Sequence, residues 1–201
     1  MDGRKMDRYK MDRRQFAQTA TAGLAAASLG LATNNSFAQN NPTPHNLKPR
    51  GSVAKFKFLQ SYPEAPNVAF QDENGRDRFL QEFKGRPLLV TFWSVNCHAC
   101  EIDMPTLPSL QAAVSGTDAM LLPVSIDSSD ATNRVRRYYR QRGLTGLPIY
   151  TDEKRLLFAF FNGFATPMHF IVDRAGHVAG GMAGAAGWNT PEAQSLFRHF
   201  V

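Results

Sequence analysis

Residues 87–100 read PLLVTFWSVNCHAC, and this stretch decides the class of fold. Its first seven residues are almost all apolar, which is typical of a strand buried on both faces. The cysteines Cys97 and Cys100 follow directly and are separated by two residues. The chain has no other cysteine, so a disulfide-rich scaffold and a four-thiolate zinc site are excluded. Any chemistry should therefore concentrate on this pair.

A Cys-x-x-Cys motif between a buried strand and a helix indicates redox chemistry. We expect the helix to begin near His98, so that unpaired N–H groups and the helix dipole favour a thiolate at Cys97. Cys97 is then the predicted nucleophile and Cys100 the resolving thiol. The redox-active disulfide Cys97–Cys100 replaces any cofactor in this prediction, and no metal is expected. A Cu(I) site, which needs only two soft ligands, is the alternative, with His98 as a further ligand.

Length and composition predict one domain with an appendage. The chain has 201 residues, and its 43% hydrophobic and 11% aromatic content excludes disorder throughout. The net charge of +6 is too mild and too dispersed to predict a nucleic-acid partner. The one basic cluster, residues 134–142, is interpreted as the solvated face of a helix over residues 131–142 that Asp130 caps.

Residues 1–38 predict a signal peptide. A basic segment that ends in Arg13-Arg14 precedes a weakly apolar run over residues 20–32, which is too short to span a bilayer. Small residues then form an A-x-A-like cleavage site that ends at Ala38. The paired arginines resemble a twin-arginine (Tat) signal, and a general secretory signal is the alternative. We expect a periplasmic product, with an uncleaved, membrane-anchored form as the alternative.

Strands alternate with helices along the rest of the chain, which predicts an α/β fold with a mixed sheet. Residues 39–60 are expected to be a flexible lead-in, and residues 61–201 the domain. Asn74-Gly75 predicts a hairpin turn. The main expected strands are residues 87–93, 120–126 and 168–172. The main expected helices are residues 98–114, residues 131–142 and a last helix from residue 190. The first of these helices is expected to be interrupted at Pro105 and Pro108.

The segment FWSVNCHACEIDMPTL, residues 92–107, resembles the active-site segment of TlpA/ResA-type thioredoxin-like proteins, a family of periplasmic thiol–disulfide oxidoreductases. The resemblance covers about residues 64–201. It implies a thioredoxin fold, an α/β fold in which helices flank a central mixed sheet, with an extra N-terminal β-hairpin and an insertion before the fourth strand. Other segments that keep the family's order and spacing are DENGR (72–76), EFKGRP (82–87), FATPMHFIVDRAG (164–176) and GWNTPEA (187–193).

The resemblance also implies further site residues. Thr166-Pro167 matches the family's cis-proline segment, which faces the cysteines and pairs with substrate backbone. A purely structural proline at the start of a strand is the alternative. Asp103 lies one helical turn after Cys100, where the family has an acidic residue. It is predicted to exchange a proton with Cys100 if burial raises its pKa, and an exposed helix-surface aspartate is the alternative.

Two departures from the family pattern bear on the direction of electron flow. Asn96 replaces the usual aromatic residue, and His98-Ala99 lacks the usual proline. A protonated His98 would stabilise the Cys97 thiolate and make the protein more oxidising. The resemblance implies a reductase that takes electrons from a membrane dithiol donor and reduces exported proteins, such as apocytochrome c or proteins with copper-site cysteines. A thiol oxidase and a copper-binding chaperone are the alternatives.

The remaining candidate residues are interpreted as structural. His169 is expected to pack inside the sheet, and Trp188 is expected to pack within the C-terminal loop. Glu101, next to Cys100, is expected to point to solvent. The phenylalanines expected in the core are Phe158, Phe160, Phe161 and Phe164.

Overall fold

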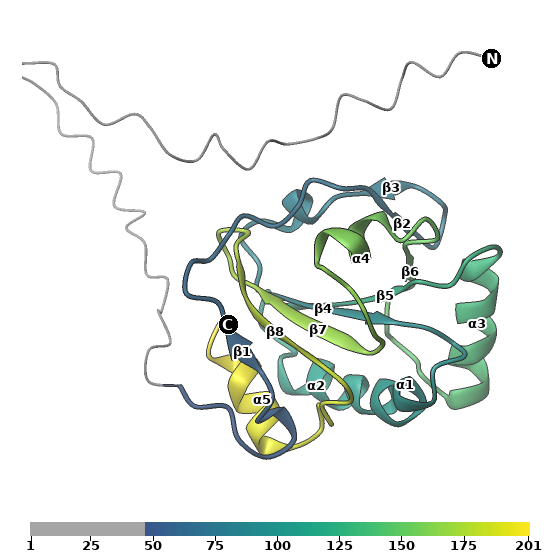
Figure 1. Cartoon of the computed structure of the whole chain (residues 1–201). Helices are drawn as coiled ribbons and strands as arrows, with labels where there is room; N and C mark the ends of the chain where they lie inside the picture. The colour runs from purple at the N-terminus through teal and green to yellow at the C-terminus, as the bar shows by residue number, and fades with distance from the viewer. Residues whose placement is uncertain (1–46) are drawn as a thin grey trace, which may run out of the picture. The chain divides into compact units, whose positions relative to one another are not determined.

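The computed structural model describes residues 47–201, and the signal peptide predicted over residues 1–38 lies outside this range. Its centre is one eight-stranded sheet with the strand order β1-β8-β7-β4-β5-β6-β2-β3 (Figure 1). β4 (Leu88–Trp93) pairs in parallel with β5 (Met120–Ser125) and antiparallel with β7 (Met168–Val172). The sheet is therefore mixed, as the alternation of strands and helices predicts.

The remaining strands complete the two edges of the sheet. They are β1 (Lys57–Phe58), β2 (Phe70–Asp72), β3 (Asp77–Arg78), β6 (Tyr150–Thr151) and β8 (Val178–Ala183). β2 and β3 are antiparallel neighbours, and Gly75 between them has φ +73°. That value lies in the left-handed region, which glycine adopts at no steric cost, so the hairpin predicted from Asn74-Gly75 is confirmed.

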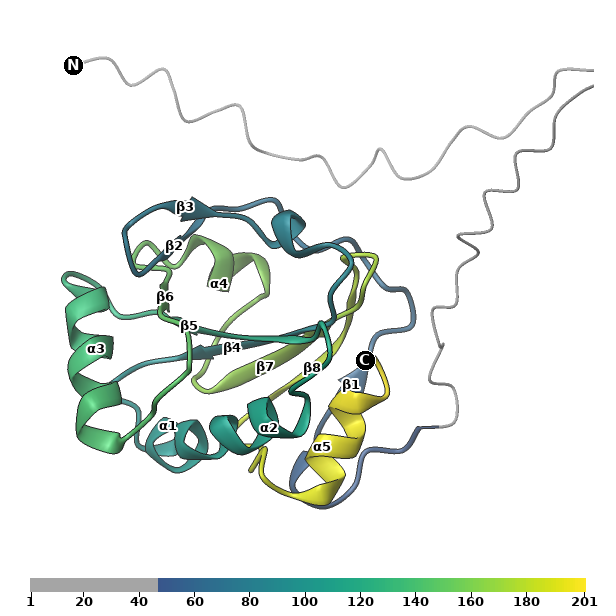
Figure 2. The ribbon, with the colours of Figure 1, turned by 180° about the vertical axis from the view of Figure 1, so that it is seen from behind.

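Helices cover both faces of the sheet (Figures 1 and 2). They are α1 (His98–Asp103), α2 (Leu107–Ala113), α3 (Ala131–Arg142), α4 (Leu156–Phe160) and α5 (Pro191–Arg198), with short 3-10 helices η1 (Gly51–Val53), η2 (Leu80–Phe83) and η3 (Met104–Thr106). The helix predicted from residue 98 is indeed divided at its two prolines, because Pro105 lies in η3 and Pro108 in the first turn of α2. α3, β6 and α4 lie between β5 and β7.

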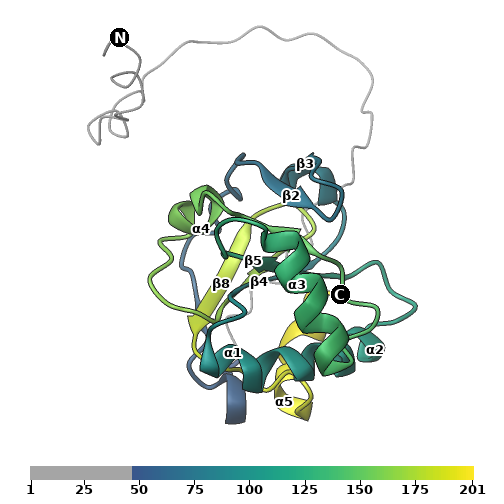
Figure 3. The ribbon, with the colours of Figure 1, turned by 90° about the vertical axis from the view of Figure 1, so that its right-hand side faces the viewer.

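The central strand β4 is buried along its whole length, because its side chains alternate between two hydrophobic cores. Leu89 and Trp93 pack in the core that α1, α2, α3 and α5 cover. Val90 and Phe92 pack in the core that α4 covers. The view along the sheet shows α1, α2 and α5 on one side and α4 on the other (Figure 3). Because β4 is buried on both faces, it fixes the position of residues 94–97, which follow its carboxyl end.

Two sequence predictions differ from the structure. Residues 47–60 belong to the predicted flexible lead-in, but Val53 and Phe56 are buried in the core and β1 pairs with β8. Their apolar side chains pack with the core that α5 covers, so the ordered part begins before residue 61. Asp130 precedes α3, but its side chain makes no cap, because its left-handed backbone (φ +54°) departs from usual cap geometry. Glu153 accepts the N–H of Ala131 instead, at 3.0 Å.

Among residues 47–201, no helix combines the length and the apolar character that a membrane crossing requires.

Candidate functional site

Cys97 and Cys100 lie at the junction between β4 and α1 and are joined by a disulfide. Residues 94–96 connect β4 to Cys97, which has an extended backbone and directly precedes α1. Cys100 is fully buried, whereas Cys97 is partly exposed. The backbone N–H of Cys100 donates to Cys97 Sγ at 3.1 Å. An incoming sulfur can therefore reach Cys97 but not Cys100, and a donor is in place for a Cys97 thiolate.

The Thr166–Pro167 segment, far from the cysteines in the sequence, faces the disulfide. The peptide bond between the two residues is cis, and the Thr166 carbonyl oxygen lies 3.3 Å from Cys97 Sγ. Pro167 is buried, and its carbonyl accepts the N–H of Gly184 at 2.8 Å, which ties the segment to the loop after β8. The fold thus brings together four of the residues that the sequence singled out, namely Cys97, Cys100, Thr166 and Pro167.

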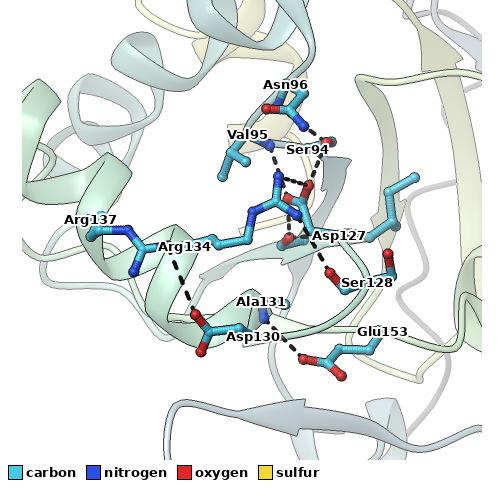
Figure 4. A network of polar contacts seen from close by, with 12 residues as sticks. Ser94, Val95, Asn96, Asp127, Ser128, Asp130, Ala131, Arg134, Arg137 and Glu153 are labelled. Carbon is cyan, nitrogen blue, oxygen red and sulfur yellow. Dashed lines mark hydrogen bonds and ion pairs between the residues drawn. The ribbon is translucent and has the colours of Figure 1, made fainter.

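A buried carboxylate that the sequence analysis did not single out holds the segment before Cys97. Asp127, just after β5, accepts hydrogen bonds from Ser94 Oγ at 2.8 Å and from Val95 N at 3.0 Å (Figure 4). Ser125 Oγ donates to the same carboxylate at 2.7 Å, and Arg134 of α3 approaches it at 3.4 Å. Asp127 is only 4% exposed. It therefore fixes the backbone that leads to Cys97.

The position of Asp127 in the sequence could have identified it as a neighbour of the cysteine motif. Asp127 directly follows a buried apolar strand, and β5 runs parallel to the strand that ends before the cysteines. The carboxyl ends of parallel strands meet at one edge of a sheet, where ligands and reacting groups gather. An acidic residue directly after such a strand is therefore a candidate neighbour of the motif.

Asp103 points from α1 into the protein and has no exposed surface, so the exposed alternative is wrong. Its Oδ1 accepts the backbone N–H groups of Ala186 at 2.7 Å and Gly187 at 3.1 Å, and its Oδ2 lies 3.2 Å from His169 Nε2. Burial alone raises the pKa of Asp103, but the contact with His169 and the two N–H donors outweigh burial, and the pKa is lowered. The raised pKa on which the predicted proton exchange depended is not found.

His169 is completely buried in β7, which confirms its predicted packing inside the protein. Its Nδ1 lies 3.1 Å from Thr91 Oγ1 and 3.3 Å from Trp188 Nε1. Its other ring nitrogen faces Asp103. Trp188 is also fully buried, as expected of a packing residue. These four side chains form a buried polar cluster on the inner side of the helix that carries Cys100.

His98 lies on the outer side of α1, and its side chain is 91% exposed. Its Nδ1 is 3.9 Å from Glu101 Oε2, and Arg142 of α3 is 3.2 Å from Glu101 Oε1. Water and salt screen such exposed charges, so we expect His98 to influence Cys97 only weakly. Within the described residues, no group of three or more His, Cys, Asp or Glu side chains is placed to hold a metal ion.

The four phenylalanines that were expected in the core behave differently. Phe158 and Phe161 are buried, but Phe160 is 54% and Phe164 is 78% exposed, so the prediction is wrong for the latter two. Phe160 lies at the end of α4, and Phe164 lies in the loop that leads to the Thr166–Pro167 segment. An exposed aromatic side chain therefore stands two residues before the carbonyl group that contacts Cys97.

Comparisons with known proteins identify the family of the chain. The chain matches the AhpC/TSA family model over residues 63–180. It is 26% identical over 129 residues to a protein named thiol-disulfide oxidoreductase ResA from Bacillus thuringiensis (strain Al Hakam), which covers 64% of this chain and 73% of the relative. It is 27% identical over 118 residues to the thioredoxin-like protein YneN from Bacillus subtilis (strain 168), which covers 59% of this chain and 68% of the relative.

The solved structures support the fold. The thioredoxin domain of a thiol-disulfide oxidoreductase from Bacteroides vulgatus superposes with a TM-score of 0.60 and 18% identity, over 71% of this chain and 99% of that domain. The predicted thioredoxin fold and the resemblance to TlpA/ResA-type proteins are thus confirmed. The chain belongs to the AhpC/TSA family, and it is a thioredoxin-like thiol–disulfide oxidoreductase.

Proposed function

We propose that this protein is a periplasmic reductase that carries electrons from a membrane dithiol donor to disulfides of exported proteins. One observation carries the proposal: the disulfide joins a partly exposed Cys97 to a buried Cys100, and the Thr166 carbonyl lies 3.3 Å from Cys97 Sγ. This arrangement separates the attacking thiol from the resolving thiol. Of the two cysteines, Cys97 is the one that a substrate can reach.

The proposed reaction is two successive thiol–disulfide exchanges. The Cys97 thiolate of the reduced protein attacks one sulfur of the substrate disulfide, and the other substrate sulfur leaves as a thiolate. Cys100 then loses its proton and attacks Cys97 Sγ, which forms the internal disulfide and releases the second substrate sulfur as a thiolate. Two electrons pass to the substrate, and the membrane dithiol donor restores the reduced protein by the same exchange in reverse.

Asp103 is the proposed acceptor of the Cys100 proton. The two residues are three positions apart on α1, so their side chains lie on one face of the helix, and both are fully buried. The carboxylate form of Asp103 is the form that can accept a proton. Asp103 then passes the proton to the departing substrate thiolate, which is the stronger base.

The surroundings of the cysteines favour a reductase over an oxidase. The Asp103 carboxylate, one helical turn after Cys100 on the same buried helix face, disfavours a second negative charge there, whereas a strong oxidant needs a stabilised reduced form. His98, the residue that would stabilise the Cys97 thiolate, is almost fully exposed, so solvent screens its charge.

Thr166 and Pro167 are the proposed binding segment for substrate backbone beside Cys97. Phe164, exposed in the same loop, offers an apolar contact for a neighbouring substrate side chain. Exported proteins with cysteine pairs, including apocytochrome c and proteins with copper-site cysteines, are the proposed substrates. Export of the protein itself rests on the signal-peptide pattern of residues 1–38.

The test is a trapping experiment in cells. A Cys100→Ser variant cannot resolve the mixed disulfide, so it should accumulate covalent complexes with exported proteins, which dithiothreitol releases. A Cys97→Ser variant should form none. Mass spectrometry of the trapped proteins identifies the substrates. Stoichiometric Cu(I) binding without any disulfide reduction by the wild type would contradict the proposal and favour the copper chaperone.

A further inference from the structure

A buried imidazole completes the surroundings of Asp103. His169 in β7 and Asp103 in α1 both have no exposed surface, and His169 Nε2 and Asp103 Oδ2 face each other at 3.2 Å. Within residues 47–201 neither atom has a hydrogen bond of regular geometry, and this approach is the polar contact that the two atoms share. His169 takes no part in the sulfur exchanges, so a buried titratable group next to the proposed proton acceptor has no role in the steps described so far.

The other ring nitrogen determines where His169 carries its proton. The indole N–H of Trp188 can only donate, and it points to His169 Nδ1 at 3.3 Å. The hydroxyl of Thr91 lies 3.1 Å from the same nitrogen and can donate as well. Nδ1 must therefore be an acceptor without a proton. The imidazole is consequently neutral, with its proton on Nε2, directed at Asp103.

The contacts of Asp103 favour its ionised, carboxylate form. Its Oδ1 accepts the N–H groups of Ala186 and Gly187, and its Oδ2 faces the N–H of His169. A proton on Nδ1 of His169 would meet the Trp188 N–H, so the imidazole proton stays on Nε2. Before the exchange, an ionised Asp103 and a neutral His169 together accommodate all the donors of the cluster.

We propose that His169 is a positioning residue of the redox centre, which keeps Asp103 in the carboxylate form and so lets it accept the Cys100 proton at acidic as well as neutral pH. The inference rests on the proposed function, because it concerns the step in which Cys100 resolves the mixed disulfide. Without His169, Asp103 would keep two backbone donors, and the cost of burying its charge would favour the protonated form. The protein would then lose its proton acceptor as the pH falls.

The groups that face this pair come from three parts of the fold. α1 contributes Cys100, β4 contributes Thr91, and the loop after β8 contributes Trp188 and two backbone N–H groups. The side chains of Thr91 and Trp188 do not ionise between pH 5 and 8. Any pH dependence of the resolving step in this range therefore reports on the Asp103–His169 pair or on the Cys100 thiol itself.

The experiment measures the resolving step as a function of pH. The reduced full-length protein is mixed with an aromatic disulfide whose thiol product is coloured. A first release of colour reports attack by Cys97, and a second release reports resolution by Cys100. The variants are His169→Leu, which removes both nitrogens, and His169→Gln, whose amide keeps a donor for Asp103 and an acceptor for Trp188. His177→Leu is the matched control, since His177 lies half-exposed in the turn before β8, at the other end of β7 from the disulfide.

In the wild type, the second rate constant should change less than about twofold between pH 8 and pH 5, because the acceptor stays ionised. In His169→Leu it should fall at least about fivefold over this range, because loss of a hydrogen bond to a buried carboxylate favours protonation. His169→Gln and His177→Leu should both behave like the wild type. Equal profiles for His169→Leu and the wild type would overturn the role of His169. Absence of any second release from the wild type would instead overturn the proposed function.

A second measurement decides the case if His169→Leu does not fold. Nitrogen NMR of the wild-type protein at neutral pH should show the proton of His169 on Nε2 and an unprotonated Nδ1. A His169 that carries a proton on Nδ1 would contradict the inference.

Discussion

The backbone N–H of Val95 donates to Asp127 Oδ2 at 3.0 Å, and this hydrogen bond joins the end of β5 to the segment that carries Cys97. The same carboxylate also accepts the hydroxyl groups of Ser94 and Ser125 and lies close to Arg134. Two neighbouring strands and α3 therefore meet at one buried acidic side chain. The position of the nucleophile depends on contacts between parts of the chain about thirty residues apart.

Replacement of this carboxylate should destabilise the protein. Asp127→Ala leaves two hydroxyl groups and the Val95 N–H without their partner, and we expect the free energy of unfolding to fall by about 2–4 kcal/mol. Urea unfolding of the oxidised protein measures the change. Asp130→Ala is the matched control in the same connection, because Asp130 is exposed, and it should cost less than about 1 kcal/mol. Equal effects of both variants would contradict the anchoring role of Asp127.

The two cysteines should differ strongly in reactivity. Cys97 is partly exposed and Cys100 is fully buried, so a brief pulse of iodoacetamide should alkylate Cys97 in the reduced protein and leave Cys100 unmodified. Peptide mass spectrometry after the pulse locates the label. Label on both cysteines at equal rates would show that the assignment of nucleophile and resolving thiol is wrong.

Replacement of His98 should have little effect on the redox equilibrium. Its side chain is 91% exposed, so solvent and salt screen its charge. We expect His98→Ala to change the equilibrium constant with glutathione by less than about threefold at physiological ionic strength. A change of about a hundredfold would restore the oxidase alternative, in which His98 stabilises the Cys97 thiolate.

Asp103 should contribute stability that acid removes. The pKa of Asp103 is lowered in the folded protein, so its contribution is fully present above the ordinary aspartate pKa of about 3.9 and is lost as the pH falls through the lowered value. The difference in unfolding free energy between the wild type and Asp103→Asn should be constant from pH 7 to 5 and should shrink below pH 4. Urea unfolding at several pH values gives the curve. Shrinkage that already begins between pH 7 and 5 would indicate a raised pKa instead.

Phe164 should matter for polypeptide substrates and not for small ones. Its exposed ring lies two residues before Thr166, whose carbonyl contacts Cys97. Phe164→Ser should raise KM several-fold for an unfolded protein disulfide, because an apolar contact is lost, and should leave the rate with a small aromatic disulfide unchanged. Leu59→Ser, at an exposed apolar residue just after β1, is the control and should change neither. An equal loss with both substrates would point to a disturbed active-site loop.

Local patterns in the sequence predicted the features that depend on near neighbours. The apolar run of residues 87–93, the two cysteines and the prolines at positions 105 and 108 predicted β4, the motif and the divided helix. Asn74-Gly75 predicted the hairpin, because the turn needs only the two residues themselves.

Contacts between distant segments were harder to predict. Asp130 is a good capping residue by type, but Glu153, from the connection between β6 and α4, accepts the first N–H of α3 instead. From the sequence, Asp103 could equally have been exposed or buried. The structure shows that it is buried, with His169 of β7 beside it. Phe160 and Phe164 are of a residue type that is usually buried, and their exposure became known only from the structure.

The reduction potential of the Cys97–Cys100 pair tests the central claim most directly. Thiol trapping of the full-length protein across glutathione and dithiothreitol buffers gives the midpoint. A reductase whose buried carboxylate disfavours a second thiolate should have a midpoint near that of thioredoxin, about −270 mV. A midpoint near about −120 mV would show a stabilised reduced form and would contradict the account.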